Sequence, residues 1–345
     1  MRADPHATDV IAPNLKRRLS GVTATIARLV PVQARSIGIA TFGPGLPDAL
    51  PRLTAWQLAT LPRDRPRVWH ARRNTEMLLG LALRHVLRRR LRLLFTSAAQ
   101  RRHSGYTRWL IGRMDGLVAT STRAASYLDR AAEVVPHGVD LASFAPAEDR
   151  KALRRRLGLS PGLWTGCMGR VRENKGTDVL VDAMLALMPD RPDLRCLIVG
   201  RIDEPAFAEA LRMRINAAGL AARFLWRSDL SWENLAEHYA ALDLYVAPPR
   251  WEGFGLTPLE AMACGVPVVT TTVGAFPDIV ADGRTGRLVP PGDAGALAAA
   301  AAAYLDDAEL RGMHGRAARA HVEEHHSIEN EAEALAAIYR RLLGA

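Results

Sequence analysis

Cysteine is scarce in this sequence, with three residues in 345, and the spacing of the three does not match a metal site. Cys167, Cys196 and Cys264 each lie in or beside an apolar stretch, which predicts buried free thiols in a reducing compartment rather than a structural disulfide. The sequence also lacks any run of about 18 apolar residues, which argues against a membrane-spanning helix. Because the first ten residues lack the apolar segment of a secretory signal, we expect a cytoplasmic protein.

Acidic side chains are depleted in residues 1–150, which hold 24 Lys and Arg against 11 Asp and Glu, a net charge of +13. The remaining residues hold 22 against 25, so the first part carries the whole positive excess. This asymmetry indicates an anionic partner, such as a phospholipid surface, a phosphorylated glycolipid or nucleic acid. We expect no nucleic-acid binding, because the basic stretches lack an interleaved series of aromatic stacking platforms and no recognisable module is present.

Apolar, strand-like runs alternate with helical patterns along the chain, which is typical of parallel α/β sheets covered by helices on both faces. With 48% hydrophobic residues, the chain is long enough for two domains with buried cores. We predict helices between the strands, one of them over 109–114, and a closing amphipathic helix over 327–343. The predicted strands are 9–13, 36–41, 68–70, 91–95, 116–121, 164–169, 194–200, 223–226, 244–247 and 266–269.

One stretch combines two carboxylates with a glycine-containing turn: residues 248–267 read PPRWEGFGLTPLEAMACGVP. Glu252 lies on a loop after a predicted strand, and Glu260 lies in the first turn of a predicted helix with Thr257 as its N-cap. Glycines between the two carboxylates let the backbone approach a ligand, and the helix N-terminus offers free N–H groups to an anion. These features favour a site for a nucleotide diphosphate that carries a hydroxyl-rich sugar.

A second motif lies upstream, where Arg170 and Lys175 follow the predicted strand 164–169 at the mouth of a helix. In an open parallel sheet, ligands bind outside the carboxyl ends of the strands. Two cations at that position can neutralise a diphosphate leaving group, as a metal ion does in other enzymes. Because no acidic pair of the D-x-D type lies near the motif, we expect no divalent metal and no other cofactor.

Together, the two motifs resemble those of the retaining, nucleotide-sugar-dependent glycosyltransferases of the E-x7-E type (group 1, family 4). Residues 252–260 are similar to the E-x7-E signature, and Gly169-Arg170 with Lys175-Gly176 is similar to the G-R…K-G motif. The resemblance implies a GT-B fold, in which two Rossmann-like, doubly wound domains face each other across a cleft.

The same resemblance implies a domain organisation. Residues 1–145 would form the acceptor-binding domain and residues 146–326 the nucleotide-sugar-binding domain. Residues 327–345 would form a helix that returns to the first domain. The resemblance does not indicate an oligomeric state.

The resemblance also implies roles for individual residues. Arg170 and Lys175 would bind the donor diphosphate and Glu252 the sugar hydroxyls, and these three are the predicted catalytic residues. Glu260 would bond the nucleotide ribose. Further donor-binding positions are Gly21, Phe254, Gly255, Leu256 and Thr257. At Gly21 the family usually has a paired glycine, and the alternative interpretation there is a capped helix after a solvated basic loop, 16–21.

Residues 16–23, 69–74 and 95–103 resemble the alphaproteobacterial mannosyltransferases that transfer mannose from GDP-mannose to the Kdo of the lipopolysaccharide inner core. This resemblance implies a lipid-linked Kdo/lipid A acceptor, which suits a domain of strongly positive charge. The alternatives are a UDP-sugar donor with another glycolipid acceptor, or a non-catalytic protein that binds sugar nucleotides at a membrane. The predicted acceptor-binding residues are His70, Arg72, Arg73, Arg101 and Arg102.

Two groups of arginines have open interpretations. Relatives often have H-x-H where this chain has His70-Ala71-Arg72. The always-charged guanidinium of Arg72 could therefore bind the Kdo carboxylate or a lipid A phosphate in a bidentate manner. Alternatively, Arg72 and Arg73 form ion pairs with nearby acids such as Glu76. Five arginines within 84–92 exceed what a helix C-terminus needs, and they predict either a membrane-facing role on the inner leaflet or ordinary solvated charge.

Overall fold

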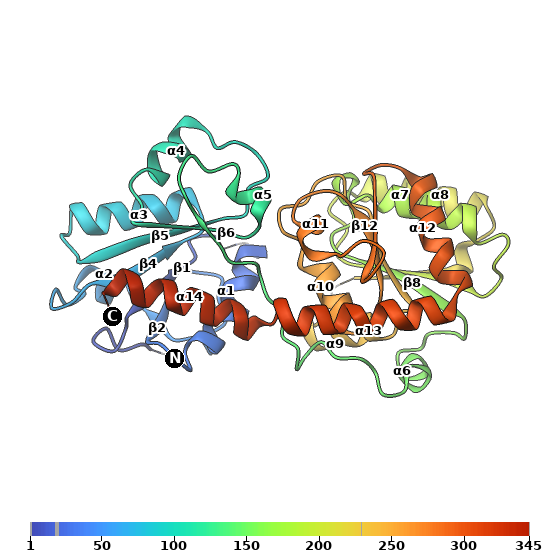
Figure 1. The fold of residues 1–345 in the computed structure, drawn as a ribbon, viewed down its shortest axis with the longest axis horizontal. Coiled ribbons are helices and arrows are strands. Elements are labelled where there is room, and N and C mark those ends of the chain that lie inside the picture. Colours follow the sequence, from blue (N-terminus) through green and yellow to red (C-terminus); the bar gives the residue numbers. More distant parts are fainter. Residues whose placement is uncertain (1, 18–20, 229, 345) are drawn as a thin grey trace. The chain divides into compact units, whose positions relative to one another are not determined.

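The computed structural model describes residues 2–17, 21–228 and 230–344 (Figure 1). It divides into two compact units, Met1–His137 with Ile328–Ala345, and Gly138–Ser327. Residues 138–145, which the sequence analysis places in the first domain, lie in the second unit. Phe144 explains the difference, because it is fully buried there and its ring packs against Tyr239 at 5.8 Å between centroids.

The first unit contains a parallel sheet in the order β3-β2-β1-β4-β5-β6-β7. The chain order reverses between β1 and β4, which places the switch point of this doubly wound sheet beside the ends of those two strands. The strands are β1 Val10–Pro13, β2 Ile39–Phe42, β3 Arg52–Leu53, β4 Arg67–Ala71, β5 Leu91–Ser97, β6 Gly116–Ala119 and β7 Glu133–Val134. The helices are α1 Gly21–Gln33, α2 Ala55–Ala59, α3 Asn74–His85, α4 Gly105–Ile111, α5 Thr122–Ala125 and α14 Ile328–Leu343.

The second unit contains a parallel sheet in the order β10-β9-β8-β11-β12-β13, with its switch point between β8 and β11. Its strands are β8 Leu163–Met168, β9 Leu194–Val199, β10 Phe224–Arg227, β11 Leu244–Ala247, β12 Val268–Thr271 and β13 Gly286–Val289. Its helices are α6 Arg150–Arg156, α7 Thr177–Leu187, α8 Pro205–Ala217, α9 Trp232–Ala240, α10 Leu256–Ala263, α11 Phe276–Ile279, α12 Ala294–Asp306 and α13 Ala308–His325, with 3₁₀ turns η1 Glu173–Lys175 and η2 Ala221–Arg223.

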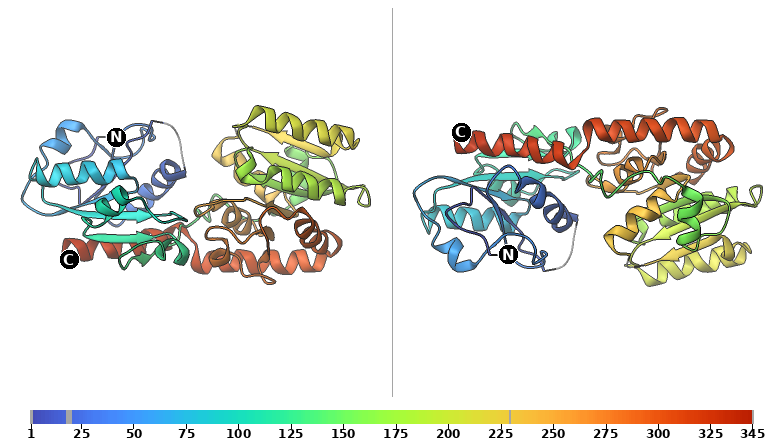
Figure 2. Two further views of the ribbon diagram at one scale, coloured as in Figure 1. Left: turned by 90° about the horizontal axis from the view of Figure 1, so that it is seen from above. Right: turned by 90° about the horizontal axis from the view of Figure 1, so that it is seen from below.

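Each sheet lies between two helical layers (Figure 2). In the second unit, side chains of α7, α8 and α12 form the core on one face, and those of α9, α10 and α13 form it on the other. In the first unit, α1 and α14 cover one face, and α2, α3 and α4 cover the other. The central strands β1, β4, β8 and β11 are therefore buried on both sides, which explains why short continuous apolar runs predicted them. The prediction of two doubly wound parallel sheets is confirmed.

Several helix boundaries differ from the prediction. Helix α10 begins at Leu256, with Gly255 rather than Thr257 at the N-cap, so Glu260 lies in the second turn. Helix α4 begins at Gly105 instead of residue 109, because the Ser104 side chain accepts a hydrogen bond from the backbone N–H of Thr107. No helix is predicted from the sequence between α12 and α14, whereas the structure has the long helix α13 there. None of the helices formed by the described residues is both long enough and apolar enough to cross a membrane.

Candidate active site

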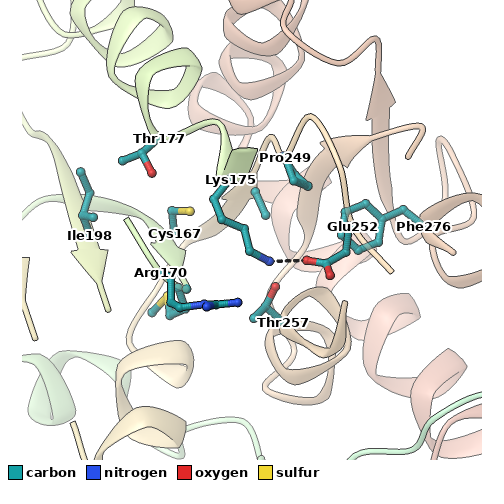
Figure 3. Close-up of a pocket in the computed structure, with 12 residues that line it drawn as sticks. Cys167, Arg170, Lys175, Thr177, Ile198, Pro249, Glu252, Thr257 and Phe276 are labelled. Carbon is teal, nitrogen blue, oxygen red and sulfur yellow. Dashed lines mark hydrogen bonds and ion pairs between the residues drawn. The ribbon is translucent and has the colours of Figure 1, made fainter. Parts of the chain in front are cut away.

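The loops that follow β8 and β11 meet at the switch point of the second sheet. Both strands end at the same edge, because they pair in parallel. Arg170 and Lys175 follow β8, and Glu252 follows β11, so side chains far apart in the sequence line one pocket (Figure 3). The pocket is lined by Cys167, Met168, Gly169, Arg170, Lys175, Thr177, Ile198, Ala247, Pro249, Glu252, Thr257 and Phe276.

Lys175 and Glu252 point toward each other and form a hydrogen-bonded ion pair between Nζ and Oε2 (Figure 3). Both side chains are largely shielded from solvent, with 24% and 17% of their surface exposed. Lys175 ends the 3₁₀ turn η1, and Gly176 follows it in the left-handed region at φ +68°. The structure thus brings together a predicted catalytic cation, Lys175, and the predicted catalytic carboxylate, Glu252. Each neutralises the charge of the other at the edge of the sheet.

Arg170 is the more exposed cation of the pocket, and its orientation depends on Asp203. Its Nη1 lies 3.1 Å from Oδ2 of Asp203, whose other oxygen accepts a bond from Nε of Arg201 at 2.8 Å. Burial acts to raise the pKa of Asp203, but the two guanidinium groups outweigh it and lower that pKa. Asp203 therefore stays ionised at neutral pH and holds the Arg170 side chain by its charge.

The N-terminal end of α10 supplies the polar backbone of the pocket. Gly255 has φ +82°, and a Cβ at this position would lie 2.4 Å from the ring of Phe276, so only glycine fits. The next two residues, Leu256 and Thr257, begin the helix, where backbone N–H groups have no partner within the helix. Phe254 packs its side chain into the core, 5% exposed. A donor-binding role for these four residues remains a prediction.

Glu260 lies deeper than the sequence suggested. Its side chain is 3% exposed, and Oε2 accepts a 2.8 Å hydrogen bond from the hydroxyl of Tyr239. Burial, followed by the nearby Glu260 charge, raises the pKa of Tyr239 well above its ordinary value, so the hydroxyl keeps its proton and donates. Glu260 thus belongs to the interior of the unit rather than to the described residues that line the pocket. Its predicted bond to the ribose is untested.

An ion-pair clamp that was not predicted from the sequence joins the loop that carries Glu252 to the turn that carries Lys175. Arg250, two residues before Glu252, forms a bidentate pair with Asp178 in the first turn of α7, with both N···O distances 2.7 Å. Its guanidinium also donates to the carbonyl of Glu173 at 2.9 Å, and its backbone N–H donates to the carbonyl of Asn174 at 3.0 Å. The loop that carries Glu252 is therefore fixed to the turn that carries Lys175. A basic residue beside Glu252 and an acid at the start of α7 were visible in the sequence, but no local pattern pairs them.

This clamp predicts that Arg250→Lys, which keeps the charge but loses the fork, lowers kcat/KM for the sugar-nucleotide donor about tenfold. The physical reason is that Lys175 and Glu252 lose their fixed separation, while neither of them is changed. The measurement is steady-state kinetics with the donor varied. Arg191→Lys is the matched control, because Arg191 forms an equally bidentate pair with Asp306, at 2.8 and 2.6 Å, away from the pocket. Equal losses in both variants, or a loss of thermal stability alone, would contradict the positioning role of Arg250.

Two of the predicted acceptor-binding residues are engaged inside the first unit. His70, fully buried, makes hydrogen bonds of 2.7 Å to the hydroxyl of Tyr339 and 2.6 Å to that of Thr96. Arg73 forms a 2.6 Å ion pair with the buried Glu76 and also donates to Asn14 at 2.8 Å. For Arg73, the structure thus shows the alternative interpretation, an ion pair with Glu76. Direct contact of either residue with an acceptor requires that these bonds be exchanged.

The other predicted acceptor-binding residues are more accessible. Arg101 and Arg102 are exposed on the loop after β5, and Arg72 is partly exposed after β4, donating from Nη1 to the carbonyl of His70 at 3.3 Å. Because β4 and β5 pair in parallel, these loops lie at one edge of the sheet. Gly21, predicted to face the donor, is the first residue of α1, and open space surrounds the position of a Cβ there. Residues 18–20 of the preceding basic loop lie outside the described residues.

The buried His70 predicts a pH dependence of stability. Burial, then the charges of Arg72 and His137, lower its pKa well below the ordinary 6.5, so the native state holds a neutral ring while the unfolded state protonates near 6.5. The stabilising contribution is present above about pH 6.5 and is lost as pH falls below it, by at most about 1.4 kcal/mol per pH unit. Denaturant unfolding of His70→Gln between pH 7.5 and 5 should show a shallower decline than the wild type.

Comparison with known proteins identifies the family. Residues 149–321 match the family model described as glycosyl transferases group 1. The whole sequence is 49% identical to the lipopolysaccharide core biosynthesis mannosyltransferase LpsB of Rhizobium meliloti (strain 1021), over 99% of both chains. The chain belongs to the group 1 glycosyltransferases. It is also 48% identical to LpcC of Rhizobium leguminosarum bv. viciae, a protein of the same description, over 99% of this chain and 98% of that one.

A solved structure of a more distant protein shows the same fold. Anabaena Alr3699/HepE in complex with UDP has 18% sequence identity and a TM-score of 0.84, over 97% of this chain and 100% of that one. The fold of this glycosyltransferase is therefore GT-B, as predicted. Within it, Arg170, Lys175 and Glu252 lie together in the pocket of the second unit, where the motif resemblance placed them.

Proposed function

We propose that this glycosyltransferase transfers mannose from GDP-mannose, with retention of configuration, to the Kdo of the lipopolysaccharide inner core. The observation that carries the proposal is the near full-length identity, 49% and 48%, to two proteins described as lipopolysaccharide core mannosyltransferases. The joining of Arg170, Lys175 and Glu252 in one pocket supports a catalytic rather than a merely binding role, because it supplies charge where a diphosphate leaving group needs it.

In the proposed reaction, the bond between the anomeric carbon of mannose and the donor diphosphate breaks, and a bond to a Kdo hydroxyl forms on the same face. The leaving diphosphate gains negative charge, which Lys175 and Arg170 neutralise. Glu252 exchanges its contact with Lys175 for hydroxyls of the sugar. The acceptor proton passes to the departing donor phosphate, so the protein needs no general base there.

The acceptor side follows from the charge of the first unit. Kdo is an acidic sugar, and lipid A is phosphorylated, so exposed guanidinium groups at the carboxyl edge of the sheet suit both anions. Arg72, Arg101 and Arg102 provide such groups on the loops after β4 and β5. We place the enzyme in the cytoplasm, at the inner leaflet of the inner membrane, where a lipid-linked acceptor is accessible.

A donor panel tests the proposal against its alternatives. Purified enzyme is given GDP-mannose, UDP-glucose, UDP-galactose or UDP-GlcNAc with Kdo-bearing lipid A, and the products are identified by mass spectrometry. We expect transfer from GDP-mannose alone and about 100-fold less transfer by Arg170→Ala. Transfer from a UDP-sugar instead would show that GDP-mannose is not the donor. Absence of transfer from every donor, with GDP-mannose bound by a folded protein, would establish a non-catalytic role.

The electrostatic role of Lys175 and Arg170 predicts activity without a divalent metal. Among the described residues, no group of three or more His, Cys, Asp or Glu side chains is positioned to hold a metal ion. Transfer from GDP-mannose should therefore persist in excess EDTA at the rate measured without it. Complete loss, restored by Mg²⁺ or Mn²⁺, would show that a metal neutralises the leaving group instead.

A further inference from the structure

Two aromatic side chains lie exposed on one short helix of the first unit. Tyr106 and Trp109, on α4, are 51% and 47% exposed, and their rings stack with centroids 6.3 Å apart at an interplanar angle of 14°. Exposed single hydrophobic residues are common, whereas two adjacent exposed aromatic rings form a larger apolar patch, the kind of feature that interaction sites have. Tyr and Trp suit the boundary between water and lipid in particular, because each has an apolar ring and a polar tip.

Cations surround this pair. The Arg113 guanidinium lies 3.8 Å from the ring centroid of Trp109, and Arg108 on the same helix has 59% of its side chain exposed. We call Tyr106, Arg108, Trp109 and Arg113 the α4 surface. Helix α4 lies beside α3 on the sheet (Figure 1), and Arg84 of α3 donates to the carbonyl of Arg113 at 3.0 Å.

The segment of the chain that contains α4 is strongly basic. Residues 84–130 contain 11 arginines and only two acidic residues, Asp115 and Asp129. Asp115 is already paired with Arg84 at 2.7 Å, and Asp129 lies 3.7 Å from Arg108. The excess positive charge therefore remains available to an anionic partner.

The α4 surface also lies next to the predicted acceptor-binding loops. Arg101 and Arg102 lie on the loop that leads from β5 into α4, at the edge of the sheet where β4 delivers Arg72. A surface that holds lipid beside this edge would present a lipid-linked sugar to the same loops.

We propose that the α4 surface is the part of the protein that docks on an anionic lipid bilayer, with Tyr106 and Trp109 entering the headgroup region and the arginines contacting lipid phosphates. The inference rests on the proposed function for its purpose, since a lipid-linked acceptor requires contact with a membrane. A bilayer accounts for both features together, because aromatic rings partition into the interface and arginines are attracted to an anionic leaflet.

Vesicle binding tests the proposal with a matched pair of variants. Co-sedimentation is measured with phosphatidylglycerol-containing and pure phosphatidylcholine vesicles at two salt concentrations. Tyr106→Ser/Trp109→Ser should lower the partition coefficient on anionic vesicles about tenfold or more, and Arg113→Glu about fivefold or more. Trp56→Ser should bind as the wild type does, because Trp56 is 75% exposed on α2 but lies outside the α4 surface. Brominated lipids should quench the fluorescence of the wild type more than that of Trp109→Phe.

The proposal is overturned by equal binding of wild type and the double variant, by an equal loss in Trp56→Ser, or by equal binding to neutral vesicles. Dissociation of a wild-type dimer by the double substitution would assign the surface to a second copy of the chain, and competition by oligouridylate alone would assign it to nucleic acid.

If the double variant fails to fold, the difference in fluorescence quenching between the wild type and Trp109→Phe decides whether the surface enters the bilayer. Transfer to a delipidated, soluble Kdo acceptor should be unchanged in the folded double variant. Vesicle binding without any sugar transfer would remove the proposed function and leave the docking surface standing.

Discussion

Replacing Lys175 with alanine is expected to lower the rate of sugar transfer by about 100-fold or more, the scale of losing a preorganised charge in a catalytic site. The substitution removes the cation nearest to Glu252 and leaves that carboxylate, 17% exposed, without its ion-pair partner. The remaining negative charge then faces the donor diphosphate instead of being neutralised, so the effect exceeds the loss of one bond. The measurement is kcat at saturating GDP-mannose, with folding checked by circular dichroism.

The sequence makes this test unusually selective, because it contains only three lysines, Lys16, Lys151 and Lys175. Lys151→Ala on the exposed side of α6 is the control and should turn over at the wild-type rate. Acetylation of wild-type lysines should inactivate the enzyme, and GDP-mannose should protect Lys175 from the reagent. Unchanged turnover of a folded Lys175→Ala at saturating donor would falsify the assignment of this pocket to the diphosphate.

Replacing Gly176 with alanine should lower the free energy of unfolding by about 3 kcal/mol or more and should abolish most transfer activity. Gly176 has φ +68°, and a Cβ there would lie 1.8 Å from the carbonyl oxygen of Pro248. The clash is with backbone, so the loop that carries Glu252 has to move away from the turn that carries Lys175.

Gly219 provides a control with the same backbone conformation, since its φ is +69° and nothing lies within 4 Å of its Cβ position. Gly219→Ala should therefore cost only about 1 to 2 kcal/mol, the strain of the left-handed region, and should leave activity intact. Denaturant unfolding and donor kinetics of both variants measure the difference. Similar stability losses in the two variants would show that the approach of Pro248 is not what requires glycine at 176.

The sequence did not predict β3, which has two residues, or β13, whose two middle residues are not buried. It did predict the central strands of both sheets, because each is a short apolar run that is buried on both faces. The stretch Leu244–Ala247 shows this, since all four residues are buried and its predicted bounds are those of β11. Helix starts were predicted less well. At α10 the N-cap is Gly255 instead of Thr257. The approach of Phe276 to 2.4 Å from the position of its Cβ requires glycine there, and no local pattern around Thr257 indicates that contact.

Helix α13 and the Arg250–Asp178 clamp were not predicted from the sequence, for two different reasons. Helix α13 is rich in Ala, Arg, Glu and His and buries only a narrow stripe, which includes Ala318 and Val322, so its apolar periodicity is weak. The clamp joins Arg250 to Asp178 across 72 residues. An ion pair at that separation exists only because parallel strands deliver both loops to one edge of the sheet.

The sequence alone determined the motifs, the parallel α/β class and the positive charge of the first 150 residues, because each is a property of residue type and local spacing. Tertiary structure decided which side chains line the pocket and which are buried or paired elsewhere. It joined Lys175 to Glu252, placed Glu260 and His70 in the interior, and paired Arg73 with Glu76. It also selected Tyr106 and Trp109 as exposed among the arginines of that unit. The physical reason is that burial and ion pairing depend on contacts between residues distant in the chain, which no run of neighbouring residues encodes.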